Sequence, residues 1–461
     1  MVEFGTAGVR GSVVDHVTPA VALAVGQAVA RIVTETESGD RSPPEVVIGR
    51  DGRTTGSALA AAAEAGVAAA GVRPVRIGQV PTPTLAFASR GRHGLMLTAS
   101  HNPPTDNGIK CFADGSEFDR EQERQIEEFV DEDAPPAEWD RWQSTVRADR
   151  LPAYREAVAD YSRAFGGDCD GLRIAVDCGT GVAANATPAV LRELGATVIG
   201  VNATVDGHFS ARPSKPTPET LSEFRELLAD GAFDLGIAHD GDGDRIVIVD
   251  SEGEIVHEDT VLAILAGYYT RQYVAEHSAD APTPVVVTTP NASGRIDEQV
   301  TAAGGRVDRV RLGGLHEGIV ATGDDESVVF AAEPWKHIHP QFGGWIDGVA
   351  SAAVIARLVA DEGLPALREP ITERPYRKVS CECPDERKSV AMEQLEDDLP
   401  EQFPEADVSF AHGIRLTFAD DSWLLVRPSG TEPYIRLYAE SNDVDALVET
   451  AEGVIGSVVD A

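Results

Sequence analysis

The sequence reads Leu95-Met96-Leu97-Thr98-Ala99-Ser100-His101-Asn102-Pro103 where an apolar run gives way to polar residues. The run Leu95–Leu97 predicts a buried strand, and the residues after it predict a tight loop that displays Ser100 at the strand end. His101 and Lys110 lie close to that serine in the chain. A serine that only caps the next element would show the same local pattern. Three further polar loops along the chain bear on the choice between these two interpretations.

Apolar strand-like runs alternate with helical patterns along the whole chain, which predicts an α/β fold. Val46–Ile48 predicts a strand before a helix over about 57–70, and Leu172–Asp177 predicts a strand before a helix that starts at Pro188. Polar segments such as the acidic, proline-containing stretch 131–142 separate these regions. With roughly 150 residues per domain as a guide, three or four domains fit the length. We expect boundaries that give domains over 1–150, 151–250, 251–370 and 371–461, the last of them α+β.

The composition excludes several classes of partner. The chain has 76 acidic and 39 basic residues, a net charge of −37 and only five lysines. Such a charge repels nucleic acid and anionic membranes, so we expect neither as a partner. Molar salt screens this repulsion, which predicts a halophilic, archaeal type of cytoplasm; activity in low-salt buffer would contradict this. With no apolar run of ~18 residues and no signal pattern at the start, we expect a soluble cytoplasmic protein.

Acidic residues alternate with glycines in Asp240-Gly241-Asp242-Gly243-Asp244-Arg245, which follows the apolar run Leu235–Ala238. In an extended segment these three carboxylates point to one side, and such oxygen ligands select Mg²⁺ or Ca²⁺. An EF-hand is excluded because Arg245 stands at its sixth position and Ser251 at its twelfth. A solvated acidic turn is the alternative to a metal site. We call residues 240–245 the aspartate loop and residues 98–103 the serine loop.

Two later loops carry groups that suit a sugar phosphate. The segment Arg427-Pro428-Ser429-Gly430-Thr431-Glu432-Pro433, with Arg436 beyond it, offers a guanidinium, hydroxyls and backbone amides for an anion. Without its arginines it would be an ordinary turn between two strands. The segment Glu333-Pro334-Trp335-Lys336-His337 offers a carboxylate, an aromatic ring and an imidazole for sugar hydroxyls, or is an ordinary loop at a strand end. We call these the phosphate loop and the sugar loop.

Together, these loops resemble the α-D-phosphohexomutase family, the phosphomannomutases and phosphoglucomutases. The order and separation of the serine, aspartate and phosphate loops carry the resemblance. Further matching segments are Phe4–Gly11, Gly49–Arg53, Asn107–Lys110 and Asp347-Gly348. The resemblance implies an α/β fold with three similar α/β domains and a C-terminal α+β domain around a central active-site cleft.

The resemblance also implies roles for individual residues. Ser100 would carry a phosphoryl group, and its oxygen would bind one Mg²⁺ per chain together with Asp240, Asp242 and Asp244. Arg245 would pair with that phosphate, and the residues with acid–base and charge-neutralising roles would be Lys110, Arg10 and His101. The substrate-binding residues would be Glu333, Trp335, His337, Arg427, Ser429, Gly430, Thr431 and Arg436.

The resemblance implies a small phosphosugar as substrate, a sugar bisphosphate as intermediate and activator, and a monomer or homodimer. We expect interconversion of the 1-phosphate and 6-phosphate of mannose or glucose. The family usually reads Glu-x-Ser-Gly-His in the sugar loop, whereas Trp335 and Lys336 stand here. Phosphoglucosamine mutase and phosphopentomutase are therefore alternatives. A sugar-phosphate phosphatase, in which water attacks the phosphoserine, and a non-catalytic sugar-phosphate sensor are others.

Overall fold

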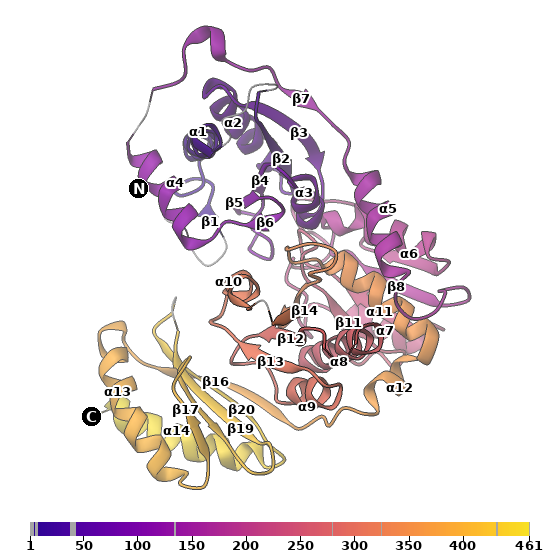
Figure 1. Ribbon diagram of the computed structural model, residues 1–461, viewed down its shortest axis with the longest axis vertical. Helices are drawn as coiled ribbons and strands as arrows, with labels where there is room; N and C mark the ends of the chain where they lie inside the picture. Colours follow the sequence, from indigo (N-terminus) through magenta and orange to yellow (C-terminus); the bar gives the residue numbers. More distant parts are fainter. Residues whose placement is uncertain are drawn as a thin grey trace. The chain divides into compact units, whose positions relative to one another are not determined.

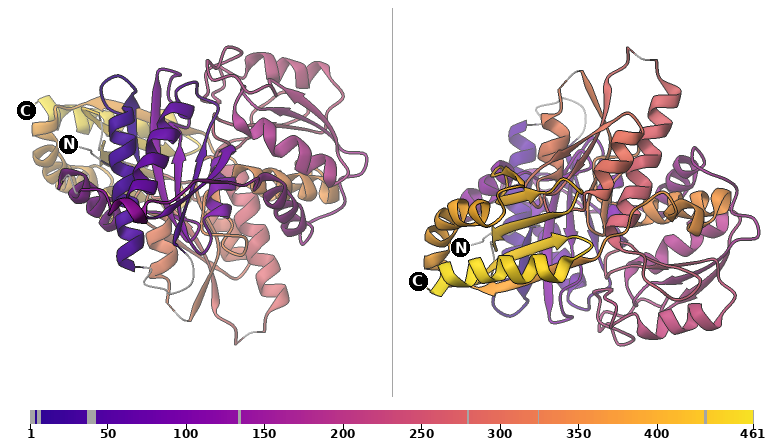
Figure 2. Two further views of the ribbon diagram at one scale, coloured as in Figure 1. Left: turned by 90° about the horizontal axis from the view of Figure 1, so that it is seen from above. Right: turned by 90° about the horizontal axis from the view of Figure 1, so that it is seen from below.

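The chain folds into two compact units (Figures 1 and 2), one of residues 1–261 and 329–368 and the other of 262–328 and 369–461. The structure is a computed structural model that describes Phe4 and residues 8–36, 43–132, 135–278, 280–323, 325–429 and 432–460. Three mixed α/β sheets and an antiparallel C-terminal sheet confirm the predicted fold class. The division into four domains at residues 150, 250 and 370 stays a prediction.

The first sheet has the strand order β1-β5-β4-β2-β3-β7, with β6 paired to β5. Strands β2, β3, β4 and β7 are parallel, whereas β1 and β5 are antiparallel to their neighbours. Parallel strands end at one edge of a sheet, so the residues after β2 and after β4 lie close together. The strands are β1 (Val9–Ser12), β2 (Glu45–Arg50), β3 (Arg73–Gln79), β4 (His93–Leu97), β5 (Asp106–Ala113), β6 (Ser116–Glu117) and β7 (Val146–Arg147).

Small residues let two helices of this region pack in close contact. A Cβ atom at Gly66 would lie 2.1 Å from the carbonyl oxygen of Leu23, so only glycine fits where α2 crosses α1. The predicted helix over 57–70 is confirmed as α2, within one residue at each end. The helices are α1 (Pro19–Thr36), α2 (Gly56–Ala69), α3 (Thr82–Ala88) and α4 (Arg120–Asp131).

The second sheet has the strand order β11-β10-β8-β9 and confirms the strand predicted over 172–177. Strand β10 pairs antiparallel with β11, with Ala238 opposite Val247, so residues 239–246 form the loop that joins them. This loop contains the three aspartates. The elements are β8 (Arg173–Asp177), β9 (Thr197–Val201), β10 (Leu235–Ala238), β11 (Val247–Val249), α5 (Leu151–Ser162), α6 (Thr187–Glu193) and α7 (Ser222–Asp230), with short 3₁₀ turns at Trp139–Arg141 and Val182–Asn185.

The third sheet has the order β13-β12-β14-β15. Strands β14 and β15 form a hairpin in which Glu333 pairs with Lys336. After it, Asp347 caps α11 by accepting the backbone N–H of Ala350 (2.8 Å). The elements are α8 (Glu258–Glu276), β12 (Thr283–Thr288), α9 (Arg295–Ala302), β13 (Arg306–Arg309), α10 (Leu315–Ala321), β14 (Glu326–Glu333), β15 (Lys336–Ile338), α11 (Gly348–Glu362) and α12 (Leu364–Arg368).

The C-terminal sheet is antiparallel, with the order β16-β20-β19-β18-β17. Residues of β19 alternate between two sides: Leu424 and Val426 pack into a core with the C-terminal helices, and Trp423 and Leu425 into a separate cluster. No helix in the described part of the chain is long and apolar enough to cross a membrane. The elements are β16 (Tyr376–Glu382), α13 (Asp385–Gln402), β17 (Asp407–Ser409), β18 (Ile414–Thr417), β19 (Trp423–Pro428), β20 (Tyr434–Glu440) and α14 (Val444–Asp460).

Candidate active site

The serine loop presents Ser100 to the aspartate loop. Ser100 has a φ of +50°, which a serine rarely adopts, and its backbone N–H donates to the hydroxyl of Thr98 (2.9 Å). Its own hydroxyl donates to Oδ2 of Asp240 at 2.6 Å, although the two residues are 140 positions apart. The side chain is buried, with 1% of Ser100 exposed. The structure thus brings together the predicted nucleophile and a predicted metal ligand.

The three aspartates converge as a cluster of buried oxygens. One carboxylate oxygen from each of Asp240, Asp242 and Asp244 lies within 4.8 Å of the others. Oδ2 of Asp242 accepts the hydroxyl of Thr82 (2.7 Å) and lies 3.2 Å from that of Thr98. Oδ1 of Asp242 and Oδ1 of Asp244 are buried and have no hydrogen-bond partner among the described residues. Buried carboxylate oxygens without a hydrogen-bond partner suit a divalent cation that prefers oxygen ligands, so these residues fit Mg²⁺.

The charges of this cluster are strongly coupled. Burial and the neighbouring carboxylates of Asp244 and Asp242 raise the pKa of Asp240 to about 8. Burial also opposes ionisation of Asp244, but the ammonium of Lys110 and the guanidinium of Arg245 hold its pKa below its usual range. Three acidic groups therefore share a small buried volume without full charge compensation from protein cations. A bound divalent cation would supply that compensation.

Lys110 lies on β5 and is buried beside the aspartates. Its Nζ lies 2.7 Å from Oδ2 of Asp244, 3.4 Å from Glu117 and 3.8 Å from Asp242. Burial alone would lower the pKa of Lys110, but these carboxylates raise it above its usual value. Lys110 is therefore a permanent positive charge near the serine, which suits charge neutralisation more directly than proton transfer.

His101, Arg10 and Arg245 surround the serine hydroxyl with further donors. Nδ1 of His101 lies 3.4 Å from Oγ of Ser100, and burial together with the charges of Arg245 and Arg10 lowers the pKa of His101 to about 3. The imidazole is therefore neutral, and it holds a proton only weakly. Nε of Arg10 and Nε of Arg245 are buried and have no hydrogen-bond partner among the described residues. Nε of Arg245 does lie 3.7 Å from Oδ2 of Asp240. Guanidinium groups with free hydrogen-bond donors near a serine suit an incoming phosphate.

Arg53 is a residue whose role the sequence analysis missed. It is fully buried (0% exposed), and its Nε pairs with Asp51 at 3.0 Å. Its guanidinium also donates, at 2.5 to 2.9 Å, to four backbone carbonyls, those of Ser100, Asn102, Pro103 and Asp106. Arg53 thus holds the serine loop in shape. Its partners are backbone atoms far along the chain, so no sequence pattern marks it beyond its place after β2.

The sugar loop lies against the aspartate loop in the same unit. Trp335, at the tip of the β14–β15 hairpin, has a φ of +67°, and its carbonyl accepts the N–H of Ile246 (3.1 Å). Lys336 forms an isolated β-bridge with Arg245, and its Nζ lies 3.4 Å from the carboxylate of Glu333. These contacts place Glu333, Trp335 and Lys336 beside the predicted metal ligands.

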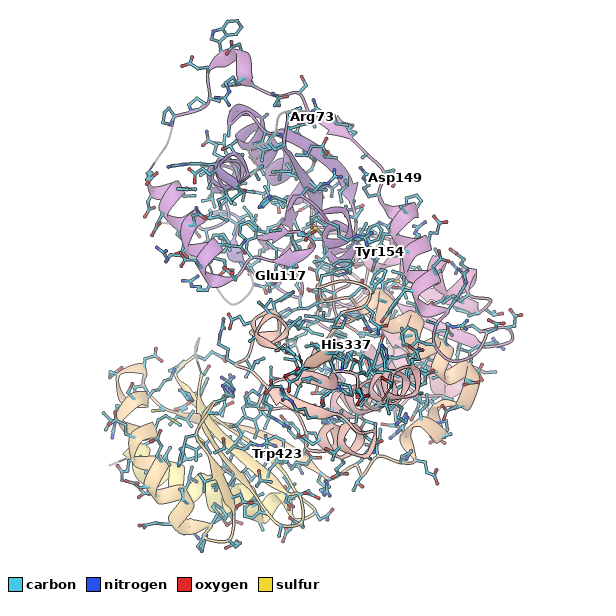
Figure 3. All side chains as sticks on the ribbon, in the orientation of Figure 1. Arg73, Glu117, Asp149, Tyr154, His337 and Trp423 are labelled. Atoms are coloured by element: carbon cyan, nitrogen blue, oxygen red, sulfur yellow. The ribbon has the colours of Figure 1, made fainter. Side chains whose placement is uncertain are left out.

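His337 lies in the same loop but has different surroundings. Its side chain is 1% exposed (labelled in Figure 3), and Nδ1 lies 3.0 Å from the hydroxyl of Ser351 in α11. Burial lowers the pKa of His337 to about 3. The ring thus packs inside the unit, where it is neutral, and its Nε2 is buried with no hydrogen-bond partner among the described residues.

The phosphate loop belongs to the second unit and joins β19 to β20. Arg427 and Arg436 are opposite each other on these strands, and Nε of Arg427 is buried without a hydrogen-bond partner in the described part of the chain. Arg436 pairs with Glu432 and also donates to Ser380. Lys388 Nζ donates to the carbonyls of Ser429 (2.7 Å) and Glu432 (2.5 Å). Two further predicted residues, Gly430 and Thr431, lie outside the described residues.

Three family models match the chain in sequence order. They describe the phosphoglucomutase/phosphomannomutase alpha/beta/alpha domain I (residues 1–136), its alpha/beta/alpha domain II (residues 152–253) and its C-terminal domain (residues 379–457). These spans contain the serine, aspartate and phosphate loops, respectively.

Curated relatives and solved structures agree over nearly the full length. The chain is 39% identical to a phosphopentomutase of Thermococcus kodakarensis, over 99% of this chain and 98% of that protein. It is 40% identical to a probable phosphoglucosamine mutase of Methanopyrus kandleri, over 99% and 97% of the two chains. A phosphoglucomutase/phosphomannomutase family protein of Burkholderia thailandensis has the same fold, with a TM-score of 0.85 at 23% identity over 99% and 98%.

Proposed function

This chain belongs to the phosphoglucomutase/phosphomannomutase family, and we propose that it is a cytoplasmic, Mg²⁺-dependent phosphosugar mutase that works through a phosphoserine at Ser100. The observation that carries the proposal is the 2.6 Å contact between Oγ of Ser100 and Asp240 within the buried aspartate cluster. A sugar bisphosphate would be both the intermediate and the activator. The reaction moves a phosphate between C1 and the terminal carbon of the sugar.

The residues of the first unit suit each step of phosphoryl transfer. Asp240, Asp242, Asp244 and the Ser100 oxygen would hold Mg²⁺, which when bound supplies positive charge at the transferred phosphate. In the first step, the free hydroxyl of the sugar monophosphate attacks the phosphorus of phosphoserine, the serine O–P bond breaks, and the hydroxyl proton passes to Oγ of Ser100. Lys110, Arg245 and Arg10 supply the positive charge that a loose phosphoryl transition state needs.

The second step returns a phosphoryl group to the enzyme. The bisphosphate turns around, and Oγ of Ser100 attacks its other phosphate while Nδ1 of the neutral His101 takes the hydroxyl proton. The bond from phosphorus to the sugar oxygen breaks, and the proton passes from His101 to that oxygen, which leaves the isomeric monophosphate. We propose that the non-reacting phosphate is held by the phosphate loop through Arg427, Ser429, Gly430, Thr431 and Arg436. A phosphatase would have no need for this second anion site.

The relatives favour a pentose or glucosamine phosphate over mannose and glucose phosphates as the substrate. Within the sugar loop, the ammonium of Lys336 lies 3.4 Å from the carboxylate of Glu333. Glucosamine carries an amine that is cationic when protonated. The ammonium of Lys336 would repel this amine, and the carboxylate of Glu333 is already paired with Lys336. Trp335 also fills space where the family pattern has a small residue. We therefore propose a phosphopentose, whose sugar part carries no charged group, as the preferred substrate, with phosphoglucosamine as the alternative.

A comparison of four substrates tests this proposal. The 1-phosphates of ribose, glucosamine, mannose and glucose are supplied to the wild-type protein with Mg²⁺ and bisphosphate, and isomer formation and phosphate release are measured separately. We expect ribose 1-phosphate to react fastest and isomer formation to exceed phosphate release. Ser100→Ala is expected to abolish isomerisation, whereas Ser162→Ala, at a buried serine of α5, keeps it.

Each result has a distinct meaning. Normal turnover by Ser100→Ala would refute the phosphoserine mechanism. Faster phosphate release than isomer formation would make the protein a phosphatase. A preference for glucosamine 1-phosphate would refute only the inference from Lys336.

A further inference from the structure

Three arginines lie on one face of the first sheet, and the proposed mechanism uses none of them. Arg76 in β3 is directly opposite Arg147 in β7. In β2, Ile48 is directly opposite Arg76. Arg50, the last residue of β2, follows Ile48 by two positions. Because side chains alternate along a strand, Arg50, Arg76 and Arg147 belong to the same face. Three neighbouring strands therefore each contribute a guanidinium to one place.

These arginines line an open hollow of about 520 Å³. Ser57, in the first turn of α2, lines it as well, and no side chain caps this turn, since Thr55 makes no such bond. Asp149 also lines the hollow, from the segment between β7 and α5 (Figure 3). The hollow thus combines guanidinium groups with a hydroxyl and one carboxylate.

The charges around the hollow are not balanced by the protein. Most arginines in the described part of the chain pair with a carboxylate, as expected where acidic residues outnumber basic ones by 76 to 39. Arg76 follows this rule and pairs with Glu64 at 2.6 Å. Arg50 and Arg147 have no ion pair within the described residues, although Asp149 lines the same hollow.

The arrangement is also unfavourable without an anion. Like charges directly opposite on neighbouring strands repel each other, as Arg76 and Arg147 do here. Burial and the charge of Arg76 lower the pKa of Arg50.

We propose that this hollow is a further anion-binding site, separate from the proposed active site, which takes a phosphate group through Arg50, Arg76, Arg147 and the hydroxyl of Ser57. Guanidinium groups bind phosphate oxygens through pairs of charge-assisted hydrogen bonds. The ligand is a small molecule, because the net charge of −37 repels nucleic acid. Binding of the phosphate group links β7, a strand of only two residues, to β3 and so stabilises the segment that leads into α5.

Hydrogen exchange of the full-length protein tests this site. Exchange of residues 143–149 is measured in potassium phosphate and in potassium chloride of equal ionic strength, with phosphate titrated. We expect phosphate to slow exchange in the wild type and Arg147→Gln to raise the half-saturating phosphate concentration about tenfold, the effect of one charge-assisted hydrogen bond. Arg147→Lys, which keeps the charge, should give a smaller change.

The matched control is Arg141→Gln, which removes the same charge from an exposed arginine earlier in the same segment. It should leave the phosphate effect unchanged. Absence of slowing in the wild type, or equal losses in Arg141→Gln and Arg147→Gln, would overturn the proposal. A parallel titration with glycerol 2-phosphate identifies the source of the ligand: half-saturation at lower concentration than phosphate supports a phosphorylated metabolite, and the reverse supports free phosphate.

Discussion

Replacing Arg53 by methionine should disable the serine loop more than any other single change outside the reacting groups. Methionine keeps much of the apolar volume but removes the guanidinium. Asp51 would then stay buried without its partner, which costs about 3–5 kcal/mol for a buried pair. The three serine-loop carbonyls and that of Asp106 would lose their donor, which costs about 1 kcal/mol or more for each.

The combined effect is smaller than the sum of these values, because Asp51 can take up a proton. Burial already raises the pKa of Asp51 to about 6, even though the charge of Arg53 lowers it. We therefore expect Arg53→Met to reduce the free energy of unfolding by about 5 kcal/mol, which is comparable with the total stability of a domain. Arg53→Lys, which keeps a charge but loses the fork, should lie between wild type and Arg53→Met.

Two measurements together test this reasoning. Urea unfolding gives the stability, and mass spectrometry follows the transfer of a phosphoryl group from sugar bisphosphate to Ser100. The matched control is Arg295→Met in the second unit, where Arg295 is 1% exposed and pairs with Glu440 at 2.7 Å. It should destabilise the protein but leave phosphorylation of the folded fraction intact. If Arg53→Met kept the urea midpoint of the wild type, and if its phosphorylation rate stayed within twofold of the wild-type rate, the proposed role of Arg53 would be wrong.

Two further predictions concern the metal and pH. Mg²⁺ at about 100 times its dissociation constant should stabilise the wild type by about 2.7 kcal/mol and raise its Tm. Asp242→Asn should lose this rise in Tm, whereas the control Asp177→Asn, at a buried carboxylate outside the cluster, should keep it. An unchanged rise in Asp242→Asn would refute the metal site. The pKa of His337 is lowered to about 3, so its contribution to stability is complete above pH ~6.5 and is lost as the pH falls toward 3. His337→Gln should therefore reduce the fall in the free energy of unfolding between pH ~6.5 and ~4, whereas His208→Gln, at an exposed histidine, should keep the wild-type fall. An equal fall in His337→Gln and in wild type or His208→Gln would contradict this assignment.

Local patterns predicted the parts of this protein that depend on neighbours in the chain. The apolar run before Thr98 and the alternation in Asp240–Asp244 each placed polar groups at a strand end, and the structure has strands there. The shared site was predicted by the family resemblance and not by a local pattern, because the serine loop follows β4 of the first sheet and the aspartate loop follows β10 of the second. The α/β class followed from the same regular alternation.

Long-range contacts decided what the local patterns left open. Lys110 acquires its role only because folding sets its Nζ 2.7 Å from Asp244. His337 carries the same local signal as Trp335 and Lys336, yet its ring packs against Ser351 inside the unit. Arg53 donates to backbone carbonyls, which every residue has, so no residue type in the sequence indicates its partners. Sequence patterns report which groups lie near a strand end, whereas burial and pairing depend on segments that meet only in the folded protein.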